Sequence, residues 1–282
     1  MSGHRSRLSD LDRFRDLGIK ALRHPVLWES SALDEAFHWE RADRSLHRLG
    51  ELGIRPIVGL LHHGSGPKST DLLDEDFPSA LALYAEQVAR RYPDVEDYTP
   101  INEPLTTARF SCLYGHWFPH QRNDFSFSRA LLNQCRGISL SMQAIRRIRP
   151  SARLIQTEDL GLVFSTPKLS YQAEFENDRR WSTFDLLSGQ VDRDHPMWSY
   201  FRWAGIDDSE LSWFVDHPCP PDVIGINHYL SGQRYLDENI ERYANQCCGG
   251  NGRDVYADML AARVLPDGPV EPEQFILDAW NR

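Results

Sequence analysis

Residues that can do chemistry follow each of five apolar stretches that the sequence predicts to be strands. The set contains acids, amides, imidazoles and a phenol, and one such strand end is expected by chance, whereas five in succession are not. In a barrel of alternating strands and helices, catalytic groups gather at the carboxyl ends of the strands. The pattern therefore predicts an active site built from Arg23 and Glu29, His62 and His63, Asn102 and Glu103, Glu158 and Asp159, and Asn227, His228 and Tyr229.

Glu103 is the central candidate. Asp97 to Ile101 reads as a short strand because Tyr, Thr and Ile favour a pleated surface. Pro104 disfavours a helical conformation for the residue before it, so Glu103 is expected where the strand ends. Taken alone, the Asn-Glu-Pro tripeptide has the alternative reading of a capped turn with a solvated carboxylate.

The elements that must position these residues alternate along the chain. Apolar spacing near the helical period and continuous apolar runs give five strands, each parallel strand being followed by helical sequence. Runs such as Ile57 to Leu61 and Val223 to Ile226 suit strands buried on both faces. We expect one α/β domain over residues 1–282. Its expected elements are helix Ser9 to Leu17, strand Ile19 to Leu27, helix Leu33 to Leu52, strand Arg55 to Leu61, a helix from about Pro78 to Tyr92, strand Asp97 to Ile101, a helix from about Ser128 to Ile148, strand Ala152 to Thr157, a longer helical and irregular region rich in Trp and Phe, strand Asp222 to Tyr229 and a last helix that begins near Pro272.

Composition narrows the class of protein. The chain has 282 residues, 41% hydrophobic and 26% charged, without an apolar run long enough to span a bilayer and without the apolar stretch of a secretory signal, so we expect a cytoplasmic location and no membrane partner. A net charge of −10 with no basic block argues against nucleic acid and favours neutral substrates. Five cysteines without metal-ligand spacing predict reduced thiols, no metal and no cofactor.

Four stretches resemble glycoside hydrolase family 1, the β-glucosidase family. Tyr98 to Pro104 resembles its Thr-Phe-Asn-Glu-Pro motif, and the other three resemble its second, third and sixth strands: Ala21 to Trp28, Pro56 to His62 and Ile224 to Tyr229. The resemblance implies a (β/α)8 TIM-type barrel, a carbohydrate substrate and retaining hydrolysis of O-glycosyl bonds.

The resemblance is closer still to one bacterial branch, the glycosidase-like N-terminal module of proteins whose C-terminal half resembles dTDP-4-dehydrorhamnose reductase. The stretches that carry it are His62 to Pro67, Asn102 to Phe110 and Tyr114 to Trp117. It implies a fused or associated sugar-nucleotide reductase domain as a partner. It also supplies an alternative function, a non-catalytic module that recognises a sugar or sugar nucleotide for that reductase.

The chain departs from the family in two places. A family member begins with a first strand that is not matched here, and its nucleophile is a glutamate in a Thr-Glu-Asn-Gly-like motif on the seventh strand, which nothing after Tyr229 matches. We therefore expect strands two to six of a barrel, truncated at both ends, with two unpaired sheet edges. Such a piece is expected to be inactive alone.

The resemblance implies a role for each main site residue. Glu103 would be the general acid/base, with its pKa raised by burial and by the nucleophile. Asn102 would bind the 2-hydroxyl, the alternative being a turn-capping amide. His62 would bind a glycone hydroxyl, unless it is a structural histidine. Arg23 would orient the two carboxylates, the alternative being a core ion pair, and Tyr229 would contact the nucleophile.

The remaining candidates are less directly supported. Glu158 lies at the end of the strand next to the strand that carries Glu103. We expect Glu158 to bind substrate or an adjacent arginine rather than to act as the nucleophile. Trp117 follows the motif loop and could stack on a sugar, although most tryptophans pack in the core. Asn227 is counted with the substrate-binding set, and His63 is the weaker of the two histidines. The glycine-containing run from Cys247 is expected to be a loop and not a phosphate cradle.

Overall fold

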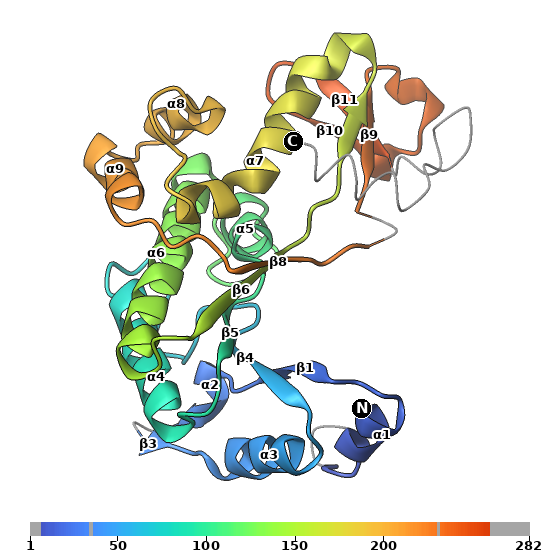
Figure 1. Cartoon of the computed structure of the whole chain (residues 1–282). Helices are drawn as coiled ribbons and strands as arrows, with labels where there is room; N and C mark the ends of the chain where they lie inside the picture. Colours follow the sequence, from blue (N-terminus) through green and yellow to red (C-terminus); the bar gives the residue numbers. More distant parts are fainter. Residues whose placement is uncertain (1–6, 34–35, 230–231, 260–282) are drawn as a thin grey trace.

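The computed structural model describes residues 7–33, 36–229 and 232–259. Its centre is a five-stranded parallel sheet in the order β1-β4-β5-β6-β8 (Figure 1). These strands are β1 Ala21–Pro25, β4 Arg55–Leu61, β5 Asp97–Ile101, β6 Arg153–Glu158 and β8 Val223–Ile226. Helices connect each strand to the next. The curled sheet and these helices form part of a (β/α)8 barrel. The predicted fold class and the five predicted strands are confirmed.

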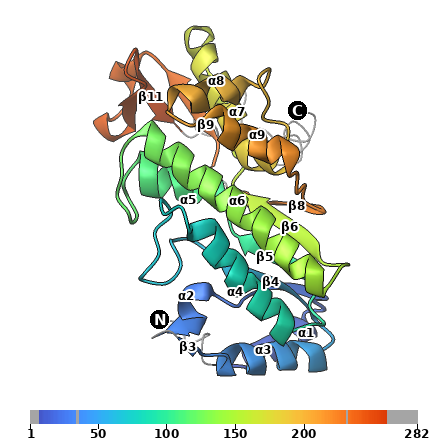
Figure 2. The same ribbon diagram turned by 90° about the vertical axis from the view of Figure 1, so that its left-hand side faces the viewer.

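Helices connect these strands. They are α1 Asp10–Asp16, α2 Trp28–Ser31, α3 Glu40–Glu51, α4 Phe77–Arg91, α5 Pro104–Ala108, the π-helical η2 Arg109–Leu113, α6 Asp124–Ile148, α7 Ser170–Leu187, α8 Pro196–Trp203 and α9 Asp208–Asp216. Helices α4 and α6 lie side by side across one face of the sheet (Figure 2). All five residues of β5 are buried, as expected for the middle strand of a parallel sheet that is covered by helices. No helix of residues 7–33, 36–229 and 232–259 is both long and apolar enough to span a bilayer.

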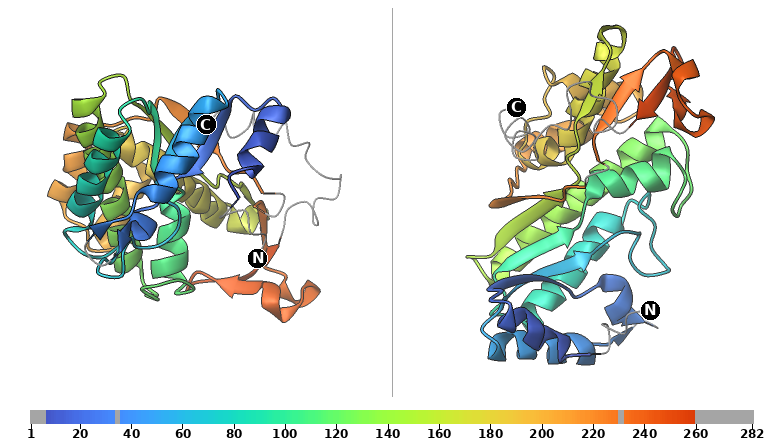
Figure 3. Two further views of the ribbon diagram at one scale, coloured as in Figure 1. Left: turned by 90° about the horizontal axis from the view of Figure 1, so that it is seen from below. Right: turned by 90° about the vertical axis from the view of Figure 1, so that its right-hand side faces the viewer.

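The two outer strands of the sheet are open. Within the described residues, β1 pairs only with β4 and β8 pairs only with β6. Val223 and Ile224 on β8 are 42% and 40% exposed, although both are apolar. The strands and the open side of the sheet can be followed in Figure 3. An apolar edge strand with unpaired backbone groups is a surface that other strands can pair with.

A second sheet lies above the carboxyl ends of the strands and was not predicted. It has the order β10-β11-β9-β7 and packs on α7 around a small apolar cluster that includes Val163, Leu236 and Tyr256. Its strands are short and distant in sequence, so no local pattern indicates the pairing. They are β7 Val163–Ser165, β9 Arg234–Asp237, β10 Cys248–Gly250 and β11 Val255–Met259, with the 3-10 turns η3 Pro167–Leu169, η4 Ile240–Arg242 and η5 Asn245–Cys247.

The predicted start of the helix after the first strand is wrong. The helix expected from Leu33 begins only at Glu40, and the residues before it form a small antiparallel pair, β2 Ala32–Leu33 with β3 Ala36–Phe37. Glu40 and Asp43 lie in the first turn of α3, where acidic side chains favour a helix N-terminus. The helix predicted near Pro272 falls outside the described residues.

Candidate functional site

The backbone fixes Glu103 where β5 meets α5. The Asn102 N–H donates to the Leu61 carbonyl at 2.9 Å and the Glu103 N–H donates to the Thr157 carbonyl at 3.1 Å, so the turn is tied to both neighbouring strands. Glu103 adopts φ 46° and ψ 63°, the left-handed region, before Pro104 opens the helix. A non-glycine residue held there costs about 1–3 kcal/mol, and such strain gathers at functional sites.

The Glu103 carboxyl group is buried and surrounded by polar side chains. It is 2% exposed. Its Oε1 accepts hydrogen bonds from Asn227 Nδ2 and, at 3.4 Å, from the Tyr229 hydroxyl, while Oε2 lies 3.8 Å from His63 Nε2. Burial raises the pKa of Glu103 and outweighs the Asn227 hydrogen bond, which lowers it. The side chain therefore has the environment of a carboxylic acid that holds a proton above its ordinary range.

Asn102 links three parts of the site. It is 3% exposed, and its Oδ1 accepts from the Thr157 hydroxyl at 3.1 Å and from Asn227 Nδ2 at 3.3 Å. Its Nδ2 lies 3.3 Å from His63 Nε2. These contacts fix the amide, with the donor side toward the imidazole and the acceptor side toward Asn227.

His63 belongs to the Glu103 cluster, although the sequence favoured His62. Its Nδ1 lies 3.0 Å from the Thr107 hydroxyl, and its ring contacts Trp117 with a centroid distance of 5.1 Å. Burial lowers the pKa of His63 to about 4, and the charges of His62 and Arg23 act in the same direction. A neutral imidazole whose Nε2 accepts from Asn102 and whose Nδ1 donates to Thr107 satisfies both contacts. Both histidines follow the end of β4, and no local pattern in the sequence indicates which of them contacts Asn102 and Thr107.

Arg23, His62 and Asn102 line one cavity of about 290 Å³ on the sheet. Arg23 Nη1 donates to the Thr157 hydroxyl at 3.0 Å, and its charge lowers the pKa of Glu103. The exposed His62 ring lies at the rim with its centroid 4.6 Å from that of His63. The structure thus brings together Glu103, Asn102, Asn227, Tyr229, Arg23 and both histidines.

Glu158, predicted to bind substrate or an arginine, is fully buried. Its side chain is 0% exposed, and Oε1 accepts from the Leu105 N–H at 2.7 Å and from the Thr183 hydroxyl at 2.6 Å. Burial raises the pKa of Glu158 to about 8. Glu158 therefore ties the first turn of α5, directly after Glu103, to α7, and a contact between Glu158 and substrate remains a prediction.

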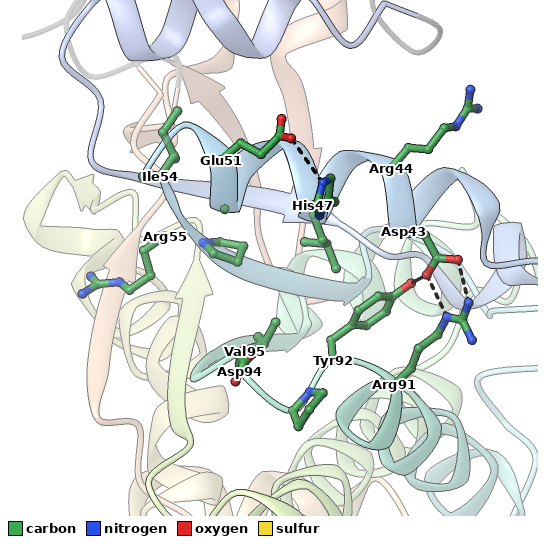
Figure 4. Close-up of a pocket in the computed structure, with 15 residues that line it drawn as sticks. Asp43, Arg44, His47, Glu51, Ile54, Arg55, Arg91, Tyr92, Asp94 and Val95 are labelled. Carbon is green, nitrogen blue, oxygen red and sulfur yellow. Dashed lines mark hydrogen bonds and ion pairs between the residues drawn. The ribbon is translucent and has the colours of Figure 1, made fainter.

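A larger hollow than the Arg23 cavity lies at the opposite ends of the strands. It measures about 1030 Å³ and lies between α3, the start of β4 and the turn before β5 (Figure 4). The polar groups that line it are engaged with one another: Asp43 binds Arg91 and Tyr92, and His47 pairs with Glu51. Residues at this end of a barrel serve stability, so its size does not make it the candidate site.

Comparison with known proteins supports the architecture. No protein-family model matches the chain. Among solved structures, the chain is similar to the β-glucosidase of Thermotoga maritima in complex with glucoimidazole, with a TM-score of 0.73 and 17% identity over 86% of this chain and 57% of that one. It is also similar to the family 1 β-glucosidase of Thermotoga maritima, with a TM-score of 0.71 and 16% identity over 82% and 55%, and to the AHE enzyme from Alicyclobacillus herbarius, with a TM-score of 0.69 and 20% identity over 83% and 55%.

The chain spans a little over half the length of these structures. At 16–20% identity the likeness establishes the fold and not the reaction. The likeness to the β-glucosidase structures supports the assignment of the five parallel strands to part of a (β/α)8 barrel.

Proposed function

We propose that this chain forms the acid/base side of a β-glucosidase-like site that hydrolyses O-glycosyl bonds with retention. One observation carries the proposal: Glu103 is a buried carboxyl group with a raised pKa at the end of a barrel strand. Retaining hydrolysis needs one carboxyl group to protonate the leaving oxygen and then to activate water. A raised pKa keeps that proton on the carboxyl group to a higher pH than an ordinary glutamate would.

The groups around Glu103 suit sugar binding. Asn102 would bind a ring hydroxyl close to the reacting carbon, and His62 at the cavity rim would bind a second hydroxyl. Arg23 would orient the carboxyl groups, and Tyr229, which already donates to Glu103 Oε1, would contact the attacking group. Trp117, packed on His63, would stack on the sugar or its leaving group.

The attacking carboxylate must lie about 5 Å from the proton donor in a retaining enzyme. Among the described residues, the acids whose charges act on Glu103 are Glu158 and Asp159, and Glu158 is fully buried with its Oε1 already accepting two hydrogen bonds. We therefore propose that further strands pair with the open edges of β1 and β8 and supply the nucleophile.

The burial of Glu158, the carboxyl group that ends the neighbouring strand, also favours a second function. The amides, the imidazoles and the arginine around Glu103 can hydrogen-bond a sugar without cleaving it. This alternative is a recognition module for a sugar or sugar nucleotide that serves a reductase, fused or associated. A cytoplasmic location fits both functions and remains a prediction.

Calorimetry with glucoimidazole tests the proposed site in the chain as it exists, because this ligand occupies the similar Thermotoga maritima structure. The variant Glu103→Gln should bind it about 10- to 100-fold more weakly, since a hydrogen bond to a charged group contributes roughly 1.5–3 kcal/mol. The exposed Glu75 provides the matched control, Glu75→Gln, which should bind like the wild type. Equal affinity in all three proteins would overturn the role of Glu103.

Turnover separates the two functions. Aryl β-glycosides are assayed with the wild-type chain alone and after mixing with the polypeptide that completes the barrel. Hydrolysis that appears on completion and is lost in Glu103→Gln supports the glycosidase. If the chain binds glucoimidazole equally well alone and after mixing, and neither preparation hydrolyses the aryl β-glycosides, the recognition module is supported.

A further inference from the structure

A second cavity of about 630 Å³ lies between α7, η2 and the small sheet β10-β11-β9-β7. It differs from the Glu103 site in its charge, because five arginines line it. They are Arg109, Arg179, Arg180, Arg234 and Arg253. The sequence as a whole is acidic and predicted neutral substrates, so this local basic cavity is a departure from what composition suggests.

Arg180 is the decisive residue of this cavity. It is 6% exposed, yet its Nε and Nη1 atoms are buried without a hydrogen-bond partner. Buried guanidinium N–H groups without a partner are costly, and proteins retain such groups where a ligand completes the bonding. Burial lowers the pKa of Arg180 to about 10, and the nearby charge of Arg109 acts in the same direction.

Two of the other arginines are neutralised by carboxylates. Arg179 pairs with Glu176, and Arg234 pairs with Asp258 at 3.2 Å. Asp124 also lines the cavity and accepts from the Tyr200 hydroxyl at 2.7 Å, so five arginines face three carboxylates and a positive excess remains.

Arg109 and Arg253 are held by aromatic rings rather than by acids. Arg109 donates to the Tyr114 hydroxyl at 3.2 Å and lies 5.4 Å from the Tyr114 ring centroid. Arg253 lies 5.6 Å from the ring centroid of Tyr171. Neither forms an ion pair within the described parts of the chain, so both charges remain available to a ligand.

The excess charge acts on the neighbours of the cavity. Burial pushes the pKa of Glu176 upward, but Arg179, Arg109 and Arg180 outweigh it and hold that pKa below its ordinary value. The pKa of Tyr114 is likewise lowered against the effect of burial, because Arg109 and Arg179 favour the phenolate. Both shifts indicate a positive potential inside the cavity.

We propose that this cavity binds an oxyanion, a phosphate or a carboxylate, carried by a small molecule with a ring. Arg180 and Arg109 would bind the oxyanion oxygens, since a guanidinium fork matches both groups. Tyr114, Phe175, Tyr200, Trp203 and Tyr256 also line the cavity and offer ring faces to the rest of the ligand.

The cavity is near the Glu103 site but separate from it. Arg109 follows Glu103 by six residues along the helical stretch α5-η2, a rise of about 9 Å. Its lining residues and those of the Arg23 cavity do not overlap. The anion site therefore does not depend on glycosidase activity.

Thermal unfolding with added ligand tests this proposal. The probes are inorganic phosphate, glucose 6-phosphate, glucuronate and glucose, each at constant ionic strength with chloride as reference, because phosphate also stabilises proteins by exclusion from their surface. Wild type should be stabilised by inorganic phosphate beyond the chloride reference and more strongly by one of the two charged sugars. The stronger of glucose 6-phosphate and glucuronate identifies the oxyanion as phosphate or carboxylate.

Arg180→Met removes the unpaired charge and keeps the length of the side chain. Its anion affinity should fall about 10- to 100-fold, while its melting temperature without ligand should equal or exceed that of wild type, because a buried unpaired charge is removed. Arg147→Met, an exposed arginine on α6, is the matched control and should keep the anion response. If Arg180→Met does not fold, the anion affinity of Arg109→Met, a substitution of a part-exposed arginine, tests the site instead.

Failure of this proposal is distinguishable from failure of the proposed function. Glu103→Gln should keep the anion response, and Arg180→Met should keep glucoimidazole binding. An anion response no larger than the chloride reference, or one that survives in both Arg180→Met and Arg109→Met, would overturn the anion site. A lower melting temperature of ligand-free Arg180→Met would show that Arg180 stabilises the fold itself.

Discussion

Asn227 donates its side-chain amide to Oε1 of Glu103 across 124 positions of sequence. The same amide nitrogen lies 3.3 Å from Asn102 Oδ1, so the ends of β5 and β8 are joined although β6 lies between them. This contact holds the carboxyl group of Glu103 in one orientation and lowers its pKa against the opposing effect of burial.

Removal of that amide should therefore shift the titration of Glu103. In Asn227→Ala the carboxylate loses a hydrogen bond worth roughly 1.5–3 kcal/mol, which corresponds to an upward shift of the Glu103 pKa by about one unit or more. Carbon-13 NMR of the glutamate carboxyl groups measures the shift. An unchanged or lower Glu103 pKa would show that Asn227 does not stabilise the ionised form.

Glu158 should make the protein less stable as the pH rises. Its folded pKa of about 8 exceeds its ordinary value of 4.5, so between these values the folded state binds the proton more tightly than the unfolded state does. Stability from this group is complete below pH 4.5 and is lost as the pH rises through 8. In Glu158→Gln this loss, on the order of a few kcal/mol, should vanish. Urea unfolding at several pH values measures the free energy of unfolding of both proteins. The same pH dependence in wild type and Glu158→Gln would contradict a raised Glu158 pKa in the folded state.

His63 should make the protein less stable as the pH falls, the opposite of the effect of Glu158. Its folded pKa of about 4 lies below 6.5, so the unfolded state takes up a proton first as the pH falls. The protein should lose stability on the order of 2 kcal/mol between pH 6.5 and pH 4, and His63→Gln should reduce that loss. Nitrogen-15 NMR of the imidazole should find His63 neutral at pH 6. A charged His63 at that pH would contradict the hydrogen-bonding pattern with Asn102 and Thr107.

Gly161 should be intolerant of any side chain. A Cβ there would lie 2.1 Å from the Gly232 carbonyl oxygen, where two backbone segments meet beneath the small sheet. Gly161→Ala should destabilise the protein by about 1–3 kcal/mol through overpacking. The matched control is Gly50→Ala on α3, where a Cβ meets nothing within 4 Å and a gain of about 0.5–1 kcal/mol is expected. Equal effects of the two substitutions on urea unfolding would contradict the close approach.

Periodicity predicted the central sheet because each strand is a local apolar run between helices. β4 and β5 have the predicted bounds, and β1, β6 and β8 lie within a few residues of theirs. The alternation of strands and helices also indicated that Asn102, Glu103 and Asn227 would share one end of the sheet, and the structure brings them into contact. Parallel strands place their carboxyl ends at one edge of the sheet, so sequence reasoning can predict that residues at these ends lie close together.

Features set by contacts distant in sequence could not be predicted in this way. The burial of Glu158 depends on Thr183 from α7, and the choice of His63 over His62 depends on Thr107 and Asn102. The arginine-lined cavity requires the pairing of β7 with β9, whose short strands carry no periodic signal. In each case the deciding partner lies on another element, where composition and spacing give no information.

The protonation state of Glu103 is the most direct test of the central claim. Carbon-13 NMR of glutamate-labelled protein is followed from pH 3 to pH 9, with Glu103→Gln to assign the resonance. Burial predicts that Glu103 titrates above its ordinary value of 4.5. A Glu103 pKa at or below 4.5 would mean an ionised carboxylate that cannot serve as the proton donor, and the proposed acid/base role would be wrong.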